Sequence, residues 1–456
     1  MRPSTRGPWV GVGLLALLPL LAGACRRGEA QTREGPPQPA PPPGPSASTS
    51  TGTAEFTATA DGSTDASDGA PREVRIDLTL AGDAIPQVKV LANDVARIVE
   101  GLPSSWGAAD ARVFNLEAPV GGRKDLPGDK SLLAFASPPA WVEGLVRSTR
   151  ASALVVANNH SCDLGAEGLT ATVSAAAAHG LPAAGASSDD PWAPVDVVDV
   201  GGRRVCLVAW TTFVNDSKGG RQRACIAGAS GTHLALAELG PRGLDTIHAA
   251  LSRPGRWDGC DARVAYLHGG REYKPQIAPV LEQAEVAAAY VDAVVITHPH
   301  VPDLVDAIAA PAPRAPEAAG GRTPGRAVPV YRSLGNFVTN QGIAWTPGMS
   351  VDLLTRDDVP DPIRTVWTRV SVLARLRFAW SAAAPPHAPP TSLRWGYGLL
   401  FSERSGEGSL QIRLRPLPNA PDDPIATKLR RAPKPFGELL DGKCRIDPDD
   451  APTCGE

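Results

Sequence analysis

Polar residues that bind metal ions in proteins follow several apolar segments of this chain, each at the point where the segment ends. The clearest case is ALVVANNHSCDLG (153–165), in which an apolar run stops at Asn158, Asn159 and His160. The other segments of this design contribute Asp83 (LTLAGDA), Asn115 and Glu117 (VFNLE), His268 and Glu272 (VAYLHGGREY), and His298 and His300 (VVITHPH). Four of the eight histidines of the chain belong to this set, a concentration that chance placement rarely gives.

These residue types predict a particular chemistry. Carboxylate and amide oxygens, together with imidazole nitrogens, suit zinc, manganese and iron. One carboxylate can bridge two such ions about 3.5–4 Å apart, and the pair then holds the attacking and leaving oxygens in phosphoryl transfer. In His298-Pro299-His300, an extended backbone would place both imidazoles on one side, because side chains alternate along it. We therefore expect a site for two divalent metal ions (Mn, Zn or Fe) without thiolate ligands.

The elements that must position these residues alternate between strands and helices. Apolar alternation predicts strands such as 74–84 and 153–157, and helical periodicity predicts helices such as 166–179 and 276–291. This order is typical of layered α/β folds, in which ligands bind beyond the carboxyl ends of the strands. The five polar strand ends would meet at one site if their strands are parallel neighbours. After Tyr331 the pattern becomes that of antiparallel strands.

Each segment also has an ordinary structural interpretation. Asp83 in Gly-Asp-Ala is typical of a turn, and His268 before two glycines would fit a loop. The joint occurrence of the segments in the same strand context favours the metal site. Within 153–165, Asp163 and Gly165 are expected to shape the turn into the next helix, and Asn158 receives no chemical role.

Composition excludes some partners. The chain has 456 residues and a net charge of −3, with 45 Lys and Arg against 48 Asp and Glu. This balance argues against a large basic surface, and we expect no nucleic-acid partner. Hydrophobic residues make up 43 % of the chain, which is enough for a sizeable core.

The N-terminus predicts export. Arg2 and Arg6 precede a short apolar run, 10–22, which is too short to span a membrane and fits a signal peptide. The run leads into LAGAC, which resembles a bacterial lipobox and makes Cys25 the expected lipidation site at the end of a lipoprotein signal peptide, 1–25. The alternative is an ordinary cleaved signal with an incidental cysteine. Residues rich in Pro, Ser and Thr, 26–72, are then expected to be a disordered tether. The expected location is the bacterial cell envelope, with the chain lipid-anchored to a membrane.

The rest of the chain divides into a folded domain, 73–418, and an extended C-terminal tail, 419–456, rich in proline and charge. Six cysteines follow Cys25, which permits disulfides in an exported protein. Cys444 with Cys454 and Cys225 with Cys260 are the candidate pairs, and Cys162 is expected to be a free, packed thiol.

Taken in order, the motifs resemble those of the CapA capsule-synthesis proteins, which are linked to poly-γ-glutamate and whose domain is similar to calcineurin-like metallophosphoesterases. The resemblance covers roughly residues 74–340. The matching motifs are LAGDA, VFNLEAPV, ANNHSCDLGAEGL, LHGGREY, THPHVP and SLGNF (333–337).

This resemblance implies a metallophosphoesterase-like α/β fold, a four-layer αββα double β-sandwich with the site at its top. It implies metal-ligand positions at Asp83, Glu117, Asn159, His268, His298 and His300. His160 would be a general acid for the leaving oxygen, a role that suits an imidazole near neutral pH. The pocket would also be lined by Asn115, Glu272 and Asn336.

Three positions depart from the family pattern and put the substrate in doubt more than the metal site. Ile296-Thr297 stand where Gly-His is usual, Gly269 replaces an aromatic residue, and Arg332 replaces a tyrosine.

Two functions are consistent with the sequence. The first is a metal-dependent hydrolase of capsule metabolism that cleaves a phosphoester or a γ-glutamyl amide. The second is a non-catalytic, membrane-anchored component for the synthesis, export or anchoring of an anionic envelope polymer. A phosphate-recognition module with a decayed site is disfavoured, because no ligand position is lost.

Overall fold

A computed structural model describes residues 73–456, with gaps at 127–133, 217, 314–320, 353–354, 357–358, 362, 406–410, 420–421, 433, 435, 448 and 456. The expected signal peptide, Cys25 and the expected tether lie outside the described residues. Within the described ranges, no helix is both long and apolar enough to cross a bilayer.

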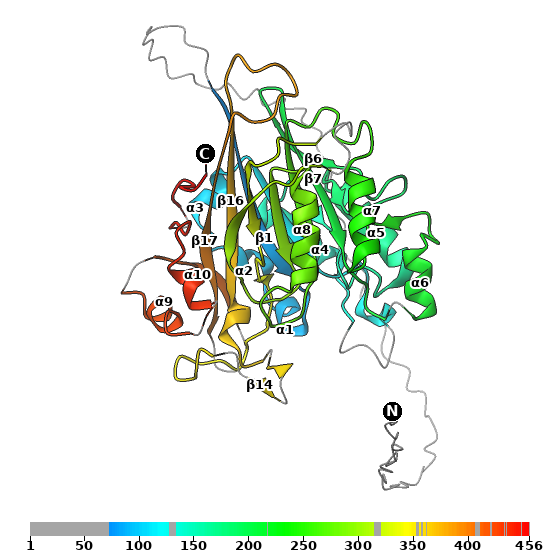
Figure 1. The fold of residues 1–456 in the computed structure, drawn as a ribbon. Helices are drawn as coiled ribbons and strands as arrows, with labels where there is room; N and C mark the ends of the chain where they lie inside the picture. Colours follow the sequence, from blue (N-terminus) through cyan, green and yellow to red (C-terminus); the bar gives the residue numbers. More distant parts are fainter. Residues whose placement is uncertain are drawn as a thin grey trace, which may run out of the picture. The chain divides into compact units, whose positions relative to one another are not determined.

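Two β-sheets form the centre of the domain (Figure 1). The first has the strand order β18-β17-β16-β1-β2-β3-β4, with β13 also paired to β1. Its strands are β1 (Val74–Ala84), β2 (Ala111–Leu116), β3 (Ala153–Val155), β4 (Ala183–Ala184), β13 (Asn336–Val338), β16 (Val370–Trp380), β17 (Ser392–Ser405) and β18 (Gln411–Leu417). β1, β2, β3, β4 and β13 pair in parallel, whereas β16, β17 and β18 add an antiparallel flank.

The second sheet has the order β11-β12-β10-β9-β7-β6. Its strands are β6 (Val195–Val200), β7 (Arg203–Thr211), β9 (Ala262–His268), β10 (Ala293–Thr297), β11 (Val305–Ala309) and β12 (Ala327–Tyr331). The four central strands pair in parallel and the two edge strands are antiparallel. β9 and β10 are buried along their whole length and are mostly apolar, as is usual for parallel strands covered on both faces.

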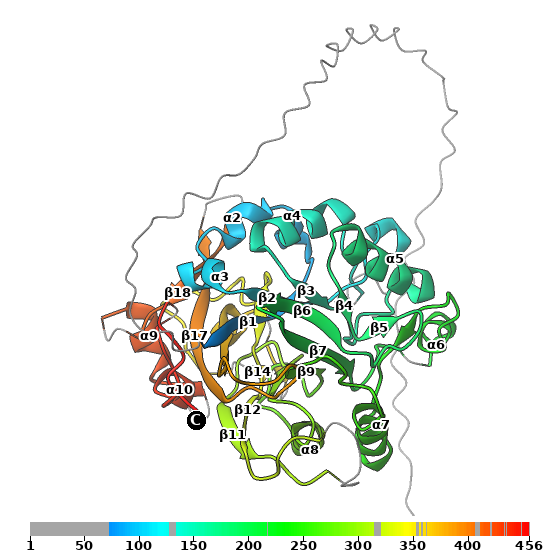
Figure 2. The same cartoon turned by 90° about the horizontal axis from the view of Figure 1, so that it is seen from above.

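Helices cover the outer face of each sheet, as the view from above shows (Figure 2). The helices α2 (Val95–Val99), α4 (Pro139–Thr149) and α5 (Gly165–Ala178) pack on the first sheet, and α7 (Pro241–Leu251) and α8 (Ala278–Ala288) pack on the second. Alternate side chains of β1 face different layers: Leu78 and Leu80 enter the core between the sheets, whereas Ala81 enters the core under the helices. The predicted four-layer αββα arrangement is confirmed.

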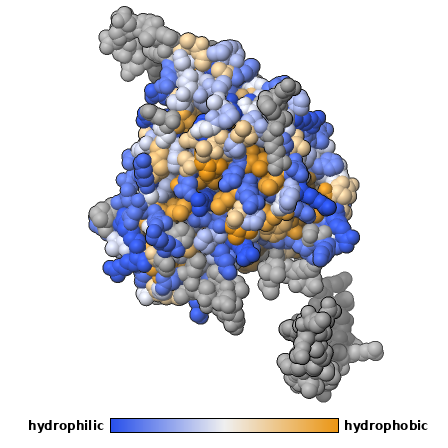
Figure 3. All heavy atoms as spheres, in the orientation of Figure 1, coloured by the Kyte–Doolittle hydropathy of each residue, from blue (hydrophilic) through white to orange (hydrophobic). Residues whose placement is uncertain are grey.

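Shorter elements complete the domain. They are α1 (Val88–Leu91), α3 (Ser104–Ala108), α6 (Gly220–Ile226), β5 (Ala186–Ser187), β8 (His233–Leu234), β14 (Thr355–Arg356) and β15 (Val359–Pro360). On the face shown in Figure 3, hydrophilic residues surround scattered hydrophobic patches. Among the described residues, the large hydrophobic side chains that are exposed are Val88, Leu239 and Ile363. The core therefore holds most of the large apolar side chains that are described.

The C-terminal segment is not the extended tail expected from its composition. It contains two short helices, α9 (Pro424–Leu429) and α10 (Phe436–Leu440), whose apolar residues join the core between the sheets. Asp423 caps α9 by accepting hydrogen bonds from two backbone amides, and Pro424 stands in the first turn, where its missing N–H costs nothing. The proline that suggested an irregular tail therefore begins a helix.

The three disulfides correct two expectations. Cys444 pairs with Cys454 as predicted, but Cys225 pairs with Cys162, and Cys260 pairs with Cys206. Cys162 is therefore not a free thiol. The tertiary structure decided these pairings, because β7 and β9 are neighbouring parallel strands and bring Cys206 beside the residues that lead into β9.

The parallel strands of both sheets direct their carboxyl ends to one region. Asp83 at the end of β1 lies opposite Asn115 of β2 and Asn336 of β13. In the second sheet, His268 at the end of β9 lies opposite Thr297 of β10. Since ligands of open α/β sheets bind beyond these strand ends, the fold places the candidate site here.

Candidate metal centre

Two buried carboxylates form the centre of the site. Asp83 lies at the end of β1, and Glu117 directly follows the adjacent parallel strand β2. Both side chains are 0 % exposed. The Asp83 carboxylate accepts a hydrogen bond from Asn115 Nδ2 at 2.7 Å. A glycine must precede Asp83, because a Cβ atom on Gly82 would lie 1.8 Å from the carbonyl oxygen of Gly335 in the neighbouring segment. The Gly-Asp pair therefore fixes this carboxylate close to β13.

The Glu117 carboxylate needs a positive partner. Neither of its buried oxygens has a hydrogen-bond partner among the described residues. The nearest imidazole nitrogens are His268 Nε2 at 3.6 Å and His300 Nδ1 at 3.8 Å. Burial, followed by the charge of Asp83, raises the pKa of Glu117 well above its ordinary value. Burying an ionised carboxylate without compensation is costly, and a bound cation would supply the missing charge.

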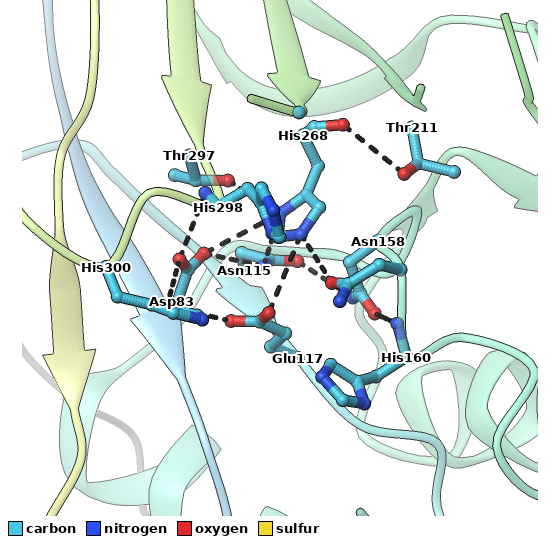
Figure 4. A network of polar contacts seen from close by, with 12 residues as sticks. Asp83, Asn115, Glu117, Asn158, His160, Thr211, His268, Thr297, His298 and His300 are labelled. Carbon is cyan, nitrogen blue, oxygen red and sulfur yellow. Dashed lines mark hydrogen bonds and ion pairs between the residues drawn. The ribbon is translucent and has the colours of Figure 1, made fainter. Parts of the chain in front are cut away.

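Three histidines surround these carboxylates (Figure 4). His268 Nε2 lies 2.8 Å from Asn159 Oδ1, and its Nδ1 lies 3.0 Å from the Thr297 hydroxyl. Burial, followed by the other site histidines, lowers the pKa of His268 and of His298 well below the ordinary value. Both imidazoles are therefore held neutral, which is the form that binds metals.

His300 behaves differently because it faces Asp83. Its Nδ1 lies 3.3 Å from Asp83 Oδ2, a contact that is electrostatic, since the angle does not meet that of a hydrogen bond. Burial opposes the charge on this imidazole, but the interactions with Asp83 outweigh it and raise the pKa of His300 overall.

The ligand atoms form two overlapping groups. One group is Glu117, His268 and His298, and the other is Asp83, Glu117 and His300, with the candidate atoms of each group within 4.8 Å of one another. The remaining predicted ligand, Asn159, joins the first group through its contact with His268. These donors are the oxygen and nitrogen ligands that zinc, manganese and iron accept, so the residues present fit metal binding.

A third group, Asp196 with Cys206 and Cys260, is different because both sulfurs are joined in a disulfide. Neither sulfur can become the thiolate that binds metals.

The His-Pro-His segment reaches the site by a different backbone from the one expected. His298 and His300 have φ angles of 101° and 59°, so the segment is a tight turn and not an extended strand. The turn is held by His298 N, which donates to Asp83 Oδ2 at 3.2 Å, and by the His300 carbonyl, which accepts from Asn336 Nδ2 at 3.0 Å. Both rings still enter the site, with centroids 5.8 Å apart.

His160 lies beside the metal-ligand groups in a network that orients it. Its Nδ1 is 2.7 Å from Asp163 Oδ2, and its ring packs on Phe135 with centroids 4.5 Å apart. Asp163, expected to shape a turn, thus contacts the imidazole directly. Asn158 also gains a role, since its oxygen accepts from His160 N and its Nδ2 donates to Asn115 Oδ1.

Asn215 is a site residue that the sequence reading missed. It follows β7, and its Nδ2 lies 3.3 and 3.4 Å from the two ring nitrogens of His160. Its Oδ1 accepts from Asn159 Nδ2 at 3.2 Å, which leaves Asn159 Oδ1 facing His268. The signal that identified the other site residues, a polar residue after an apolar segment, was also available for Asn215.

The two other predicted pocket residues differ in position. Asn336 is buried, and its Oδ1 has no hydrogen-bond partner among the described residues. Glu272 is exposed, but its charge contributes to the raised pKa of both Glu117 and His300. Glu272 therefore acts from the edge of the site.

The structure explains two departures from the family pattern. A Cβ atom on Gly269 would lie 2.5 Å from the Thr212 hydroxyl, so an aromatic side chain has no room there. Thr297 makes a hydrogen bond to His268 Nδ1, which leaves Nε2 for the metal site.

Comparison with known proteins gave one family. A family model described as bacterial capsule synthesis protein PGA_cap matches residues 77–341. This range contains every site residue named above. A comparison with curated proteins gave no match.

Proposed function

The chain belongs to the PGA_cap family of bacterial capsule synthesis proteins, and from this premise we propose that its site is a dinuclear, metal-dependent hydrolase centre of the cell envelope. The observation that carries the proposal is the position of Glu117. Glu117 belongs to both groups of candidate ligands, with Oε1 nearest His268 and Oε2 nearest His300, and neither oxygen has a hydrogen-bond partner among the described residues, which suits a carboxylate shared by two cations.

The site residues divide into those that would bind the metal ions and those that would orient these ligands or transfer a proton. Asp83, Glu117, Asn159, His268, His298 and His300 would hold the two ions. Bound divalent cations would supply Lewis-acid polarisation of a phosphoryl or carbonyl group and an activated water. Asn115 and Thr297 would orient their neighbours Asp83 and His268.

His160 would supply the proton for the leaving group. With Nδ1 directed at Asp163 Oδ2, the second proton of the imidazolium is on Nε2, from which it can pass to the departing oxygen or nitrogen. Asp163 fixes the orientation of the imidazole. A phosphoester is the favoured substrate because the fold is metallophosphoesterase-like, and a γ-glutamyl amide of an anionic capsule polymer is the other candidate.

The proposed location is the outer side of a bacterial membrane, with the domain anchored through a lipid on Cys25. Three disulfides in the described domain support an oxidising compartment. A Cys25→Ser variant expressed in a bacterial host should lose labelling by a radioactive fatty acid and leave the membrane fraction. Unchanged labelling would contradict the anchor.

The hydrolase proposal is tested with the purified domain. Elemental analysis should find two divalent ions per chain, and a screen of chromogenic phosphoesters and γ-glutamyl amides should find turnover. Asp83→Asn should lose both metal and turnover. A chain without bound metal would contradict the proposal, and two ions without turnover of any substrate would favour the non-catalytic role in polymer synthesis, export or anchoring.

A further inference from the structure

Tyr273 lies at the edge of the metal centre and has no part in the function proposed above. It belongs to the loop that follows β9, and its ring packs on the imidazole of His300 with centroids 5.7 Å apart. His300 is 3 % exposed, whereas Tyr273 is half-buried, so the tyrosine stands between that imidazole and solvent.

The backbone of Tyr273 is strained in a way that points to a role for the side chain. Its φ angle is 60°, a conformation that bulky residues rarely adopt. The strain is held by a hydrogen bond from Tyr273 N to the carbonyl oxygen of Pro299 at 2.7 Å. The loop of Tyr273 is therefore attached to the His-Pro-His turn.

The direction of the Tyr273 hydroxyl follows from hydrogen bonds that cannot be reversed. Asn336 Nδ2 lies 3.0 Å from the carbonyl oxygen of His300 and 3.0 Å from that of Thr368. Carbonyl oxygens only accept, so this atom must be the amide nitrogen. The same nitrogen lies 2.9 Å from the Gln341 side chain, which must therefore present its oxygen to Asn336.

The orientation of Gln341 then fixes the phenol. With Oε1 turned to Asn336, Nε2 lies 3.1 Å from the Tyr273 hydroxyl. An amide nitrogen only donates, so the phenol oxygen accepts this bond and its own hydrogen remains available. Within the described part of the chain, this hydroxyl has no other hydrogen-bond partner. The fold thus holds an O–H donor beside His300 without giving it an acceptor.

We propose that the Tyr273 hydroxyl binds a phosphoryl oxygen of the substrate by donating a hydrogen bond to it. The inference rests on the proposed function for the presence of a phosphoryl group, whereas the orientation of the donor rests on Asn336 and Gln341. A donor fixed before the reaction stabilises the negative charge on such an oxygen without reorganisation. Loss of one such donor lowers turnover by about 100- to 1000-fold.

The first test is the affinity of the metal-loaded chain for inorganic phosphate, measured by titration calorimetry. Tyr273→Phe should keep the metal content of the wild type and weaken phosphate binding about 5- to 10-fold. If the wild type turns over a phosphoester, the same variant should lower kcat about 100- to 1000-fold. A variant that binds phosphate as tightly as the wild type, or that loses metal, would overturn the inference.

The second test uses the direction of the hydrogen bonds. In Gln341→Glu, the new carboxylate accepts the phenol hydrogen and withdraws the donor from the site. The added charge itself also repels phosphate, so the variant is compared with the double variant Tyr273→Phe/Gln341→Glu. Gln341→Glu should weaken phosphate binding less in the phenylalanine background than in the wild type, and equal effects in both backgrounds would contradict the inference.

A matched control is Tyr397→Phe, which removes a phenol that donates to the Leu439 carbonyl at 2.7 Å, away from the site. It should leave phosphate affinity unchanged, and a loss equal to that of Tyr273→Phe would overturn the assignment. The two proposals fail separately. A wild type that binds metal and phosphate but turns over no substrate contradicts the hydrolase, while the phosphate affinities still decide the role of Tyr273.

Discussion

The two loops that bring histidines to the site, 158–163 and 297–300, differ in how the protein satisfies their polar atoms. In the first loop, Asn158 and His160 are hydrogen-bonded within the chain, and Ser161 Oγ donates to backbone carbonyls. In the second loop, the Nδ1 atoms of His298 and His300 are buried without a hydrogen-bond partner among the described residues.

The backbones of the loops differ as well. A disulfide from Cys162 to Cys225 joins the first loop to α6, whereas two residues of the second have positive φ angles. The first loop is therefore held by contacts within the protein, and Asn159, its proposed ligand, is oriented by Asn215. The second loop has a strained backbone and imidazole Nδ1 atoms without a hydrogen-bond partner among the described residues. The comparison indicates that the proposed proton donor is supported by a fixed orientation, whereas the histidines proposed as ligands keep ring nitrogens free of other contacts.

The largest effect is expected at the second loop. His298→Ala removes a ligand from the first metal group, so metal content should fall and turnover should fall by at least about 1000-fold. Elemental analysis and a chromogenic phosphoester assay measure the two effects. His179→Ala, at an exposed histidine outside the site, is the control and should change neither. Full metal content in His298→Ala would contradict the proposal that loop 297–300 supplies metal ligands.

At the first loop, we expect loss of turnover without loss of metal. His160→Ala should lower kcat by about 100- to 1000-fold, because it removes the proton donor and none of the metal ligands. Asp163→Asn should cause a smaller loss, since the imidazole remains. Elemental analysis of each variant measures whether the metal is kept. A His160→Ala protein that has lost its metal would show that this residue is a ligand.

Asn215→Ala should have an intermediate effect, because Asn215 positions both His160 and Asn159. We expect a loss of about 10-fold in kcat and a change in the pH profile of kcat that is assigned to His160. Asn419→Ala, an exposed asparagine far along the chain, is the matched control. A change in thermal stability with an unaltered pH profile would mean that Asn215 is structural only.

Removal of metal should loosen only one of the two loops. In the chelated protein, amides of 297–300 should exchange hydrogen faster, because the strained turn loses the ligand that its imidazoles bind. Amides of 158–163 should change by a smaller factor, because side-chain hydrogen bonds and a disulfide hold this loop even where Asn159, a proposed ligand, loses its metal contact. Hydrogen exchange with mass spectrometry measures both segments, and equal loosening would refute the comparison.

Metal affinity itself should depend on pH. A metal ion needs Glu117 ionised, but burial and then Asp83 raise its pKa well above 4.5, so binding must displace a proton at any pH below the raised value. His300, whose pKa Asp83 raises against burial, acts in the same direction. The lowered pKa values of His268 and His298 leave these imidazoles neutral. Zinc affinity should therefore rise with pH, by up to about tenfold per pH unit for each proton displaced.

A competing chelator measures this affinity over a series of pH values. Glu117→Gln should weaken binding and flatten its pH dependence, since the amide does not titrate. A wild-type affinity that stays constant or falls with rising pH would contradict the assignment of Glu117.

The stability of the metal-free protein should respond to the Glu117 proton in the opposite direction to metal affinity. A raised pKa in the folded state means that Glu117 favours folding while protonated, and that this contribution is lost as pH rises through the raised pKa. The lowered pKa values of His268 and His298 act the other way, because these imidazoles are neutral in the folded state and cost stability only at low pH. In Glu117→Gln the loss of stability at high pH should therefore disappear.

Much of the site could be predicted from the sequence because strand ends carry a local signature. Asp83, Glu117 and His268 each follow apolar runs, and parallel strands place such ends together. The family motifs supplied the ligand assignments, and the structure brings five of the six residues into two groups and places Asn159 against His268.

Other features had no local signal. The disulfide partner of Cys162, the contacts of Asn215 and the packing of α9 and α10 each join residues distant in the chain. The turn at His298 was wrongly expected to be extended, because residue spacing does not reveal a positive φ angle.

The sequence by itself determined the layered α/β class of the fold and the chemical type of the site, since alternating apolar patterns and the residues that end them are local properties of the chain, and the family resemblance added the four-layer arrangement. Only the tertiary structure decided which polar atoms are satisfied by the protein and which are left for a ligand. Among the residues that the structure describes, the oxygens of Glu117 and the phenol hydrogen of Tyr273 have no partner because of what lies around them in space. Hydrogen-bond partners come from several strands at once, and no stretch of sequence contains that information.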